Sequence, residues 1–420
     1  MFKILHITPH LGGGVGKCVS ELIMNCNEHS HIVCLLEKPK NSLFITILKN
    51  FGTLCLIEPT TEELNLVIQK ADIVQIEFWN HPTLIKFLCS RVYNEARWIV
   101  WCHISGTYFP KIPSQLPQLV EKFIVTTEAS LNLEYLHNKA KSRIDFISSG
   151  VVSIHKNINR TPKKKFNCAY IGTLSKCKIH SDFVYFLSHI KHLLGSFKFY
   201  GDLTDAHFLM NDCEKNNMTH AVEFKGFTND ILTELNDIDI LIYLLNPKHY
   251  GTAENALLEA MSKGVIPVVL PNPAETNIVK HRFNGLVIEN PKELTNEITW
   301  LVNNPQEQLR ISKNAKKFAI TNHSTEILTS KFKKLYKKIG RVKKAPLNFK
   351  TAFGSNPFSF FKSFIKSPND SSRLDEIMSL AYSLNPHLAR ADSKGSAIHF
   401  HKVFPESNEL KQCVNYLSNS

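Results

Sequence analysis

Short apolar runs alternate with helix-like segments along the first half of the chain. Six of these runs have the length of buried strands and are rich in β-branched and aromatic residues; they cover residues 2–7, 32–36, 53–57, 73–76, 98–101 and 123–126. A glycine-rich turn follows the first run, and residues 16–24 then have helical spacing. Strand patterns that alternate with helical patterns predict a doubly wound parallel sheet.

This pattern breaks at residues 148–150 and at the polar, basic run 157–165, which we interpret as a linker. A second α/β series follows, with a helical pattern at 253–263 and strand-like runs at 166–171, 197–200, 222–224, 238–243 and 265–269. The sequence therefore predicts two Rossmann-like, doubly wound parallel-sheet domains, residues 1–160 and 166–340, that face each other across a cleft. Ligands of such sheets bind at the carboxyl ends of the strands.

An amphipathic helical pattern at residues 331–344 precedes an irregular tail. Phe332, Leu335, Tyr336 and Ile339 fall on one helical face, and lysines surround them. Two interpretations stay open: a solvated helix with one face on the core, and a helix on a membrane surface. Residues 345–420 have no clear period, which predicts a C-terminal appendage of undefined fold.

The length and composition limit the class of protein. A chain of 420 residues exceeds what one hydrophobic core usually supports, in agreement with two domains. No apolar run is long enough to cross a membrane and no signal-peptide pattern precedes the first strand-like run, so we expect a soluble, cytoplasmic protein. Ten cysteines without CxxC pairs or zinc-type spacing predict reduced thiols and no metal site.

The net charge of +13 favours anionic partners of some kind. Nucleic acid, a membrane surface and phosphorylated substrates all fit that charge. The sequence has no zinc finger, RNP motif or recognition-helix pattern, which argues against nucleic acid.

Glycines at positions 12–14 and 16 directly follow the first predicted strand. Gly13 and Gly14 would let the backbone approach a ligand closely, and the next helix offers N–H groups and a positive dipole end. A phosphate or a sugar would fit there, and a plain tight turn is the competing interpretation. After the fourth predicted strand, Trp79, Asn80 and His81 fit either a sugar platform or a capped loop with a core tryptophan.

Two more segments place polar side chains at predicted strand ends. His103 follows the run 98–101 and would point into the cleft, where either ring nitrogen can bond a hydroxyl or a phosphate; a structural histidine is the alternative. Lys178 lies past the turn that follows residues 166–171, where a lysine neutralises a diphosphate as a point charge. Lys176 is the second candidate for that role, and a solvated lysine is the alternative.

The segment 249–269 carries the most specific pattern. A turn at Gly251 and Thr252 opens a helix whose first N–H groups suit a phosphate. Glu254 falls in the first turn of that helix and Glu259 lies further along; at about 100° per residue they do not share a face. Glu259 would grip two vicinal ribose hydroxyls and Glu254 would favour the positive helix end, with two solvated glutamates as the alternative.

In their order along the chain, these five segments resemble the retaining glycosyltransferases of family 4, which have the GT-B fold of two Rossmann-like domains. The resemblance covers about residues 1–340 and is strongest at 237–288. There, ALLEAM at 256–261 followed by GVIPVV at 264–269 resembles the donor-binding helix and strand of the family, and NGLV at 284–287 resembles its next signature.

The resemblance implies a nucleotide-sugar donor site in the second domain and an acceptor side in the first. Glu259 would bind the donor ribose, Lys178 the donor diphosphate, and His103 the transferred sugar or its phosphate. The loop with Gly13 and Gly14 would close on the donor or the acceptor. The helix start would bind the distal phosphate through its N–H groups, which gives a further set of donor-binding residues: Thr252, Asn255, Ala256, Leu257 and Leu258.

One departure from the family concerns its second glutamate. The family has two glutamates separated by seven residues, and counting back from Glu259 the first position here is Gly251. Either Glu254 would replace the missing carboxylate from a different place, or the contact would come from the backbone; the first alternative adds Glu254 to His103 and Lys178 as a catalytic residue. A subgroup with the pattern Tyr-Gly-Thr-Ala-Glu-Asn shares this departure.

A second departure removes one charge from the donor side. Where the family often has the arginine of a Gly-Arg-Leu turn, this chain has Thr173, which we place among the donor-binding residues. Lys176 or Lys178 would then carry more of the phosphate charge.

The implied reaction moves a sugar with retention from a nucleotide sugar to a hydroxyl, without a cofactor or a bound metal. Family habits suggest a glycan or lipid-linked acceptor in bacterial surface polysaccharide or lipopolysaccharide synthesis, and the basic helix suggests peripheral contact with the inner face of the membrane. Two other functions stay open. One is a non-catalytic glycan- or nucleotide-binding partner of another transferase, and the other is a nucleotide-sugar epimerase.

Overall fold

The computed structural model describes residues 1–39, 41–94, 96–136, 141–153, 160–252, 254–367 and 369–419. The chain divides into two compact units. Unit 1 comprises Met1–Ser149, Tyr250–Ala253 and Thr325–Ser420; unit 2 comprises Gly150–His249 and Glu254–Ser324. Unit 1 therefore includes residues 325–340, which the sequence assigned to the second domain, together with the whole tail. Residues 157–159 of the expected linker lie outside the described residues.

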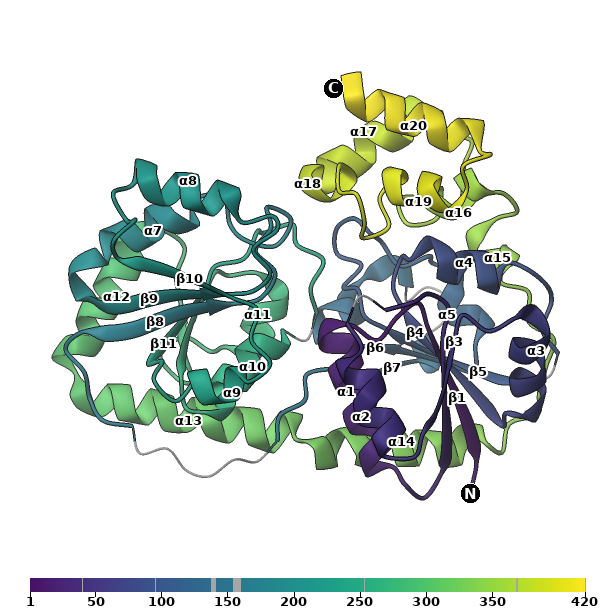
Figure 1. Cartoon of the computed structure of the whole chain (residues 1–420), viewed down its shortest axis with the longest axis horizontal. Helices are drawn as coiled ribbons and strands as arrows, with labels where there is room; N and C mark the ends of the chain where they lie inside the picture. Colours follow the sequence, from purple (N-terminus) through teal and green to yellow (C-terminus); the bar gives the residue numbers. More distant parts are fainter. Residues whose placement is uncertain are drawn as a thin grey trace. The chain divides into compact units, whose positions relative to one another are not determined.

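Unit 1 is built on a parallel sheet with the strand order β3-β2-β1-β4-β5-β6-β7. Helices lie on both faces of this sheet (Figure 1). Both faces are therefore covered, which explains why β5 is apolar without interruption from Trp98 to Cys102. The strands are β1 Lys3–Thr8, β2 Ser30–Leu35, β3 Leu54–Ile57, β4 Ile73–Phe78, β5 Arg97–Cys102, β6 Lys122–Val125 and β7 Ile144–Phe146.

In unit 1, the helices and 3-10 turns between β1 and β7 connect the successive strands of the sheet. They are α1 Gly13–Asn25, α2 Leu43–Asn50, α3 Thr61–Lys70, α4 Pro82–Leu88 and α5 Leu116–Leu119, with the 3-10 turns η1 Glu128–Asn132 and η2 Lys141–Arg143.

Unit 2 repeats the architecture with the strand order β10-β9-β8-β11-β12-β13, again parallel throughout its described pairs. Its core gathers the apolar faces of the helices on the sheet. The strands are β8 Phe166–Ile171, β9 Leu194–Tyr200, β10 Val222–Gly226, β11 Ile240–Tyr243, β12 Ile266–Val269 and β13 Leu286–Val287. The helices are α7 Phe183–His189, η3 Lys191–Leu193, α8 His207–Lys215, α9 Ile231–Glu234, α10 Asn255–Ser262, α11 Pro273–Ile278, α12 Pro291–Asn303 and α13 Pro305–His323.

The amphipathic pattern near residue 335 belongs to α14, Thr325–Ile339, which packs in unit 1. Its four predicted apolar residues are all buried: Phe332 lies 4.8 Å from the ring of Trp101, and Tyr336 donates a hydrogen bond to Gln75. The apolar face of α14 is therefore occupied by the core of its own unit. This leaves the exposed lysines on its other side for any contact with an anionic surface.

The tail that lacked a clear period in the sequence is helical. It forms α15 Lys350–Phe353, α16 Pro357–Lys362, α17 Leu374–Leu384, α18 Pro386–Ala389, α19 Ala397–Val403 and α20 Asn408–Asn419. In Figure 1, α16–α20 form a small helical cluster next to α4. Most of these helices are short, which hides their 3.6-residue period in the sequence.

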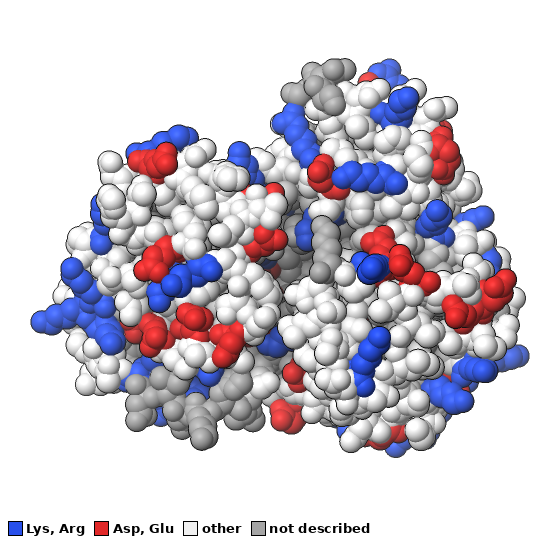
Figure 2. Space-filling model, viewed as in Figure 1, with Lys and Arg blue, Asp and Glu red and all other residues white. Residues whose placement is uncertain are grey.

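Figure 2 shows how the charged side chains are distributed over one face of the protein. On the face drawn in Figure 2, acidic side chains lie between the basic ones, so this face has no continuous basic field. In the described part of the chain, none of the helices combines the length and the apolar character that crossing a bilayer requires.

The structure corrects the predicted elements at several points. Strands β7 and β13, three and two residues long, were not predicted. The helix expected at 16–24 begins earlier, at Gly13, and the one expected at 253–263 runs from Asn255 to Ser262. Residue 253 of that prediction lies outside the described residues.

Candidate functional site

In each sheet the strand order reverses at one point, because the early strands are added on one side of the first strand and the later strands on its other side. In unit 2, β8 and β11 are neighbours, and their successors β9 and β12 lie on opposite sides. The loops after two such strands diverge and leave a crevice at the carboxyl end of the sheet, where ligands of this fold bind. Lys178 lies in the loop after β8, and His249 and Glu254 lie in the segment after β11.

Lys178 forms a buried ion pair with Glu254. Its Nζ lies 2.7 Å from Glu254 Oε2, and the Tyr243 hydroxyl donates to the same oxygen at 2.6 Å. Burial raises the pKa of Glu254, but Lys178 and His249 outweigh this, so the pKa lies below its ordinary value. Lys176, the second candidate, instead lies 5.7 Å from the ring of Phe208. The structure thus brings Lys178, and not Lys176, to the centre of this cluster.

Glu254 occupies a different place from the one predicted. It precedes α10 as its N-cap residue, with left-handed backbone at φ 44°, and its side chain makes no capping bond. The carboxylate therefore does not lie in the first turn of the helix. It points to Lys178 and Tyr243, and is 5% exposed.

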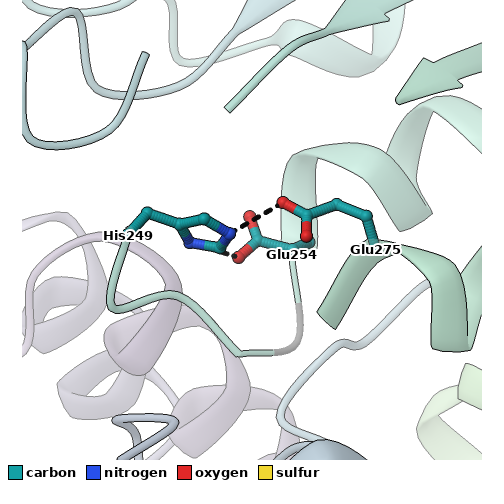
Figure 3. A group of neighbouring side chains, drawn as sticks. All are labelled: His249, Glu254 and Glu275. Carbon is teal, nitrogen blue, oxygen red and sulfur yellow. Dashed lines mark ion pairs between the residues drawn. The ribbon is translucent and has the colours of Figure 1, made fainter. Parts of the chain in front are cut away.

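His249 connects Glu254 to a second buried carboxylate, Glu275 of α11. His249 Nε2 lies 2.9 Å from Glu275 Oε1, and Nδ1 lies 3.9 Å from Glu254 Oε1 (Figure 3). Glu275 is fully buried, and neither of its carboxylate oxygens has a hydrogen-bond partner among the described residues. Parallel pairing of β11 with β12 places the segments after both strands at the same edge of the sheet, which brings Glu275 to His249.

These three residues offer ligand atoms within 4.8 Å of one another, so we asked whether they fit a metal ion. The two carboxylates meet different nitrogens of the same imidazole. A chelated ion needs one imidazole nitrogen and both carboxylates on the same side. The arrangement therefore fits an imidazole between two carboxylates better than a metal centre.

The start of α10 presents the predicted phosphate-binding N–H groups. The Leu258 N–H already donates to the Glu254 carbonyl at 3.1 Å, so the expectation narrows to Asn255, Ala256 and Leu257. The Leu257 side chain is fully buried, so Leu257 can contribute through its backbone N–H alone. Glu259, the predicted ribose ligand, lies on the same helix and is half-buried.

Two further donor-side candidates lie in loops. Thr173 follows Gly172 at the end of β8, and its carbonyl accepts a hydrogen bond from Tyr170. Thr252 is 8% exposed and belongs to unit 1 with its neighbours 250 and 251.

In unit 1 the reversal of chain direction falls between β1 and β4. Gly13 and Gly14 follow β1, begin α1 and are both exposed. His103 follows β5, beside β4, and its backbone N–H donates to the Phe78 carbonyl. Its Nε2 lies 3.0 Å from Glu77 Oε2. The loops expected to carry chemistry in this unit therefore share the carboxyl edge of its sheet.

The segment proposed as a sugar platform divides into buried and half-exposed residues. Trp79 is half-buried and lies beside the rings of His10 and His103. Asn80 is 3% exposed and donates to the carbonyl of Lys394, so its amide is already used inside the unit. Trp79 remains the candidate for stacking on a sugar.

Sequence reasoning assigned no role to several polar residues that the structure places at these edges. They are Tyr243, His249 and Glu275 in unit 2, and His6 and Glu77 in unit 1. One signal was available: His6 and Glu77 interrupt apolar strands that are buried on both faces, and buried polar groups need partners.

Comparisons relate this chain to known proteins. Residues 151–318 match the family model described as "Glycosyl transferases group 1". The chain is 35% identical over 72 residues to the glycosyltransferase 1 domain-containing protein 1 of Xenopus tropicalis. That alignment covers 17% of this chain and 21% of the relative, so the chain spans about a fifth of the length of that curated protein.

Solved structures show the same fold over most of the chain. Anabaena HepE, in its complex with UDP-glucose, superposes with a TM-score of 0.65 at 16% identity, covering 80% of this chain and 100% of that one. A glycosyltransferase from Rickettsia africae gives a TM-score of 0.64 at 16% identity, covering 81% and 99%. Together with the two parallel sheets, these likenesses establish the GT-B fold for the chain, and residues 151–318 within it match the glycosyl transferases group 1 model.

Proposed function

We propose that this chain is a retaining glycosyltransferase of family 4 that moves a sugar from a nucleoside diphosphate to an acceptor hydroxyl. The observation that carries the proposal is the Lys178 ammonium, held 2.7 Å from a buried carboxylate at the reversal point of the second sheet. This lysine lies inside the glycosyl transferases group 1 region, as does the start of α10. A cation and helix N–H groups at one sheet edge suit a diphosphate.

In the proposed reaction, Lys178 and the N–H groups of Asn255, Ala256 and Leu257 stabilise the leaving diphosphate. Charge develops on that group as the glycosidic bond breaks, so preorganised donors aimed at it lower the barrier. The departing phosphate oxygen accepts the proton of the acceptor hydroxyl on the same face of the sugar, which needs no side-chain base. Glu259 binds the ribose, and the loop with Gly13 and Gly14 closes on the donor or the acceptor.

The acceptor belongs to the same proposal. The resemblance to family 4 supports a glycan or lipid-linked acceptor in bacterial surface polysaccharide or lipopolysaccharide synthesis. Exposed lysines along α14 support peripheral contact with the anionic inner face of the membrane, since each lysine near such a surface gains about 1 kcal/mol. No cofactor or metal is required in this scheme.

A thermal-shift screen with UDP, GDP, ADP, CMP and their common sugars tests the donor site. A nucleotide at about 100 times its dissociation constant should stabilise the protein by about 2.7 kcal/mol. We expect the shift to disappear in Glu259→Ala and to weaken strongly in Lys178→Met. Lys176→Met is the matched control, because Lys176 lies against Phe208 and should keep the shift. If no nucleotide shifts the melting temperature of the wild-type protein, the transferase proposal fails.

A further inference from the structure

The C-terminal tail rests on the edge of the unit 1 sheet where ligands of this fold bind. Its loop 391–396, between α18 and α19, lies against the segment that follows β4: the Asn80 amide donates to the carbonyls of Lys394 at 2.8 Å and Gly395 at 3.3 Å. Helix α19 packs on α4, the helix after that segment (Figure 1). Because β4 flanks the reversal point of this sheet, the segments after β1 and β4 border its binding crevice. The tail lies outside the residues that match the family model, so it brings side chains to this edge that the model does not describe.

Aromatic rings connect the tail to the other segments of this edge. The ring of His399, in α19, lies 4.6 Å from the ring of His81, and the two are almost perpendicular. The His81 ring lies 6.1 Å from that of Trp79 and 5.9 Å from that of His10, which follows β1. Segments after β1 and β4 and the tail therefore meet in one cluster, which includes the tryptophan that is the candidate for stacking on a sugar.

A hydrogen bond inside the loop fixes the ring proton of His399. The Gly395 backbone N–H donates to His399 Nδ1 at 3.1 Å. A backbone N–H can only donate, so Nδ1 is an unprotonated acceptor and Nε2 carries the proton. Within the described chain Nε2 has no hydrogen-bond partner, and it is not among the buried atoms that lack one, so solvent reaches it. His399 thus presents an N–H donor at this edge.

The electrostatic environment of His399 is positive. Burial, and then the charges of Lys402, His10 and Lys394, lower the pKa of His399 to about 4. Lys394 is exposed, and its ammonium lies near enough to His399 to act on it. An N–H donor in a positive environment favours an anionic group over a neutral one.

Two carboxylates stand close to this cluster, and each has a partner of its own. Asp392 lies 3.8 Å from the Lys402 ammonium. Glu37 accepts a hydrogen bond from Thr83, and its other oxygen lies 3.5 Å from His81 Nε2. These pairs leave the positive environment of His399 in place.

His81 gives an independent sign of a ligand. Its side chain is 6% exposed, and its Nδ1 is buried without a hydrogen-bond partner among the described residues. Buried polar atoms normally have such a partner. A bound ligand atom beside the rings of His81 and His399 would supply it.

We propose that the tail adds an oxyanion subsite to unit 1, in which the His399 Nε2–H and the Lys394 ammonium bind a carboxylate or phosphate group of an acidic glycan acceptor. Both groups only donate, which suits an oxyanion, and a charge-assisted hydrogen bond is stronger than a neutral one. Trp79 lies on the same edge and stacks on a sugar ring of this acceptor. The acceptor role rests on the proposed function, whereas the binding of the oxyanion does not.

The direct test is NMR of the full-length protein with labelled histidine rings, assigned with single His→Asn variants. The probes are methyl β-D-glucuronide, which carries a carboxylate, and glycerol 3-phosphate, with methyl β-D-glucoside as the neutral control, all at constant ionic strength. We expect an acidic probe to shift the His399 resonances with saturation, and the probe that does so names the group. If neither acidic probe shifts them, or if the glucoside shifts them equally, the proposal is wrong.

His399→Asn removes the donor and keeps the loop. The asparagine oxygen takes the place of Nδ1 and still accepts from Gly395, but no N–H remains at the position of Nε2. With the His81 ring as the reporter, binding of the acidic probe should weaken about tenfold or more, the worth of one hydrogen bond to a charged group. Unchanged affinity in this variant overturns the proposal.

Lys394→Asn removes the ammonium without straining the turn. Lys394 has φ +63°, a left-handed backbone that asparagine adopts more readily than most residues. Affinity for the acidic probe should fall about two- to fivefold at low salt, and this difference should vanish at about 1 M salt. Lys411→Gln, an exposed residue of α20, is the matched control and should change nothing. If Lys394→Asn behaves like this control, the ammonium is not part of the subsite and the proposal fails.

The outcomes separate this inference from the proposed function. UDP affinity should stay unchanged in both variants, and an equal loss of UDP and probe affinity overturns the local subsite. If His399→Asn does not fold, the wild-type titration and Lys394→Asn still decide. A wild-type protein that binds the acidic probe at His399 but binds no nucleotide would support the subsite and count against the transferase. Nucleotide binding without a response at His399 would do the opposite.

Discussion

Replacing Lys178 by Met removes an ammonium that lies 2.7 Å from Glu254 Oε2 and keeps most of the side-chain volume. Both partners are largely buried, with side-chain exposures of 13% for Lys178 and 2% for Glu254. Removing one partner of a buried pair costs about 3–5 kcal/mol, because it leaves an uncompensated charge. The Tyr243 hydroxyl still donates to Glu254, so we expect about 3 kcal/mol.

The cost should depend on pH in a definite direction. In the wild-type protein the pKa of Glu254 is lowered on folding, so the pair stabilises the fold above the pKa of the unfolded carboxyl, ordinarily 4.5, and this contribution is lost as the pH falls through the folded pKa. Without Lys178, burial dominates and the pKa of Glu254 rises. The deficit of the variant should therefore be largest near pH 7 and should shrink as acid protonates Glu254.

Thermal unfolding followed by circular dichroism between pH 4 and 7 measures both effects, at about 2–4 °C per kcal/mol for a domain of about 150–250 residues. Lys178→Met/Glu254→Gln should recover at least about 1 kcal/mol relative to Lys178→Met, since the amide carries no charge. A deficit below about 1 kcal/mol, or one that stays constant over this pH range, would refute the buried ion pair as the source of stability.

Two further predictions concern other parts of the chain. Gly395 has φ +72°, and a Cβ there would lie 2.0 Å from the side-chain amide nitrogen of Asn80. Gly395→Ala should therefore lower the free energy of unfolding by about 2–4 kcal/mol in urea titrations. Gly52 is the control: it has φ +90° but open space around it, so Gly52→Ala should cost about 1 kcal/mol. Lys334, Lys337 and Lys338 are exposed on α14. Changing all three to Gln should weaken binding to phosphatidylglycerol vesicles by about 3 kcal/mol at low salt in sedimentation assays. Binding that changes neither with salt nor with these substitutions contradicts the membrane contact.

The sequence predicted the central strands and the loops that follow them because those features are local. The apolar runs in β5 and β11 are continuous, since helices cover both faces of the sheets, and this makes them visible in the sequence. Strands β7 and β13 are too short to show a period. The tail was not resolved into helices for a similar reason, because α15, α16 and α18 have four to six residues each.

The side chains that complete each site could not be predicted from the sequence, because the residues they contact are distant in the chain. Glu275 meets His249 only after β11 and β12 pair, and Glu77 meets His6 across 71 residues through the neighbouring strands β4 and β1. A motif can identify the loop that carries Lys178, but not the carboxylate that holds the lysine in place. That carboxylate was expected to interact with the helix dipole, and a left-handed backbone at Glu254 turned it away.

The two buried networks show why strand order must be known before roles are assigned. In each unit, a carboxylate at the reversal point of the sheet faces a cation or an imidazole from a neighbouring loop: Glu254 with Lys178 in unit 2, and Glu77 with His103 in unit 1. Since an isolated buried carboxylate is costly, each of these groups constrains the charge and orientation of its partner. The residue that contacts a ligand can thus be named from a loop motif, whereas the carboxylate that orients it comes from a neighbouring strand or loop.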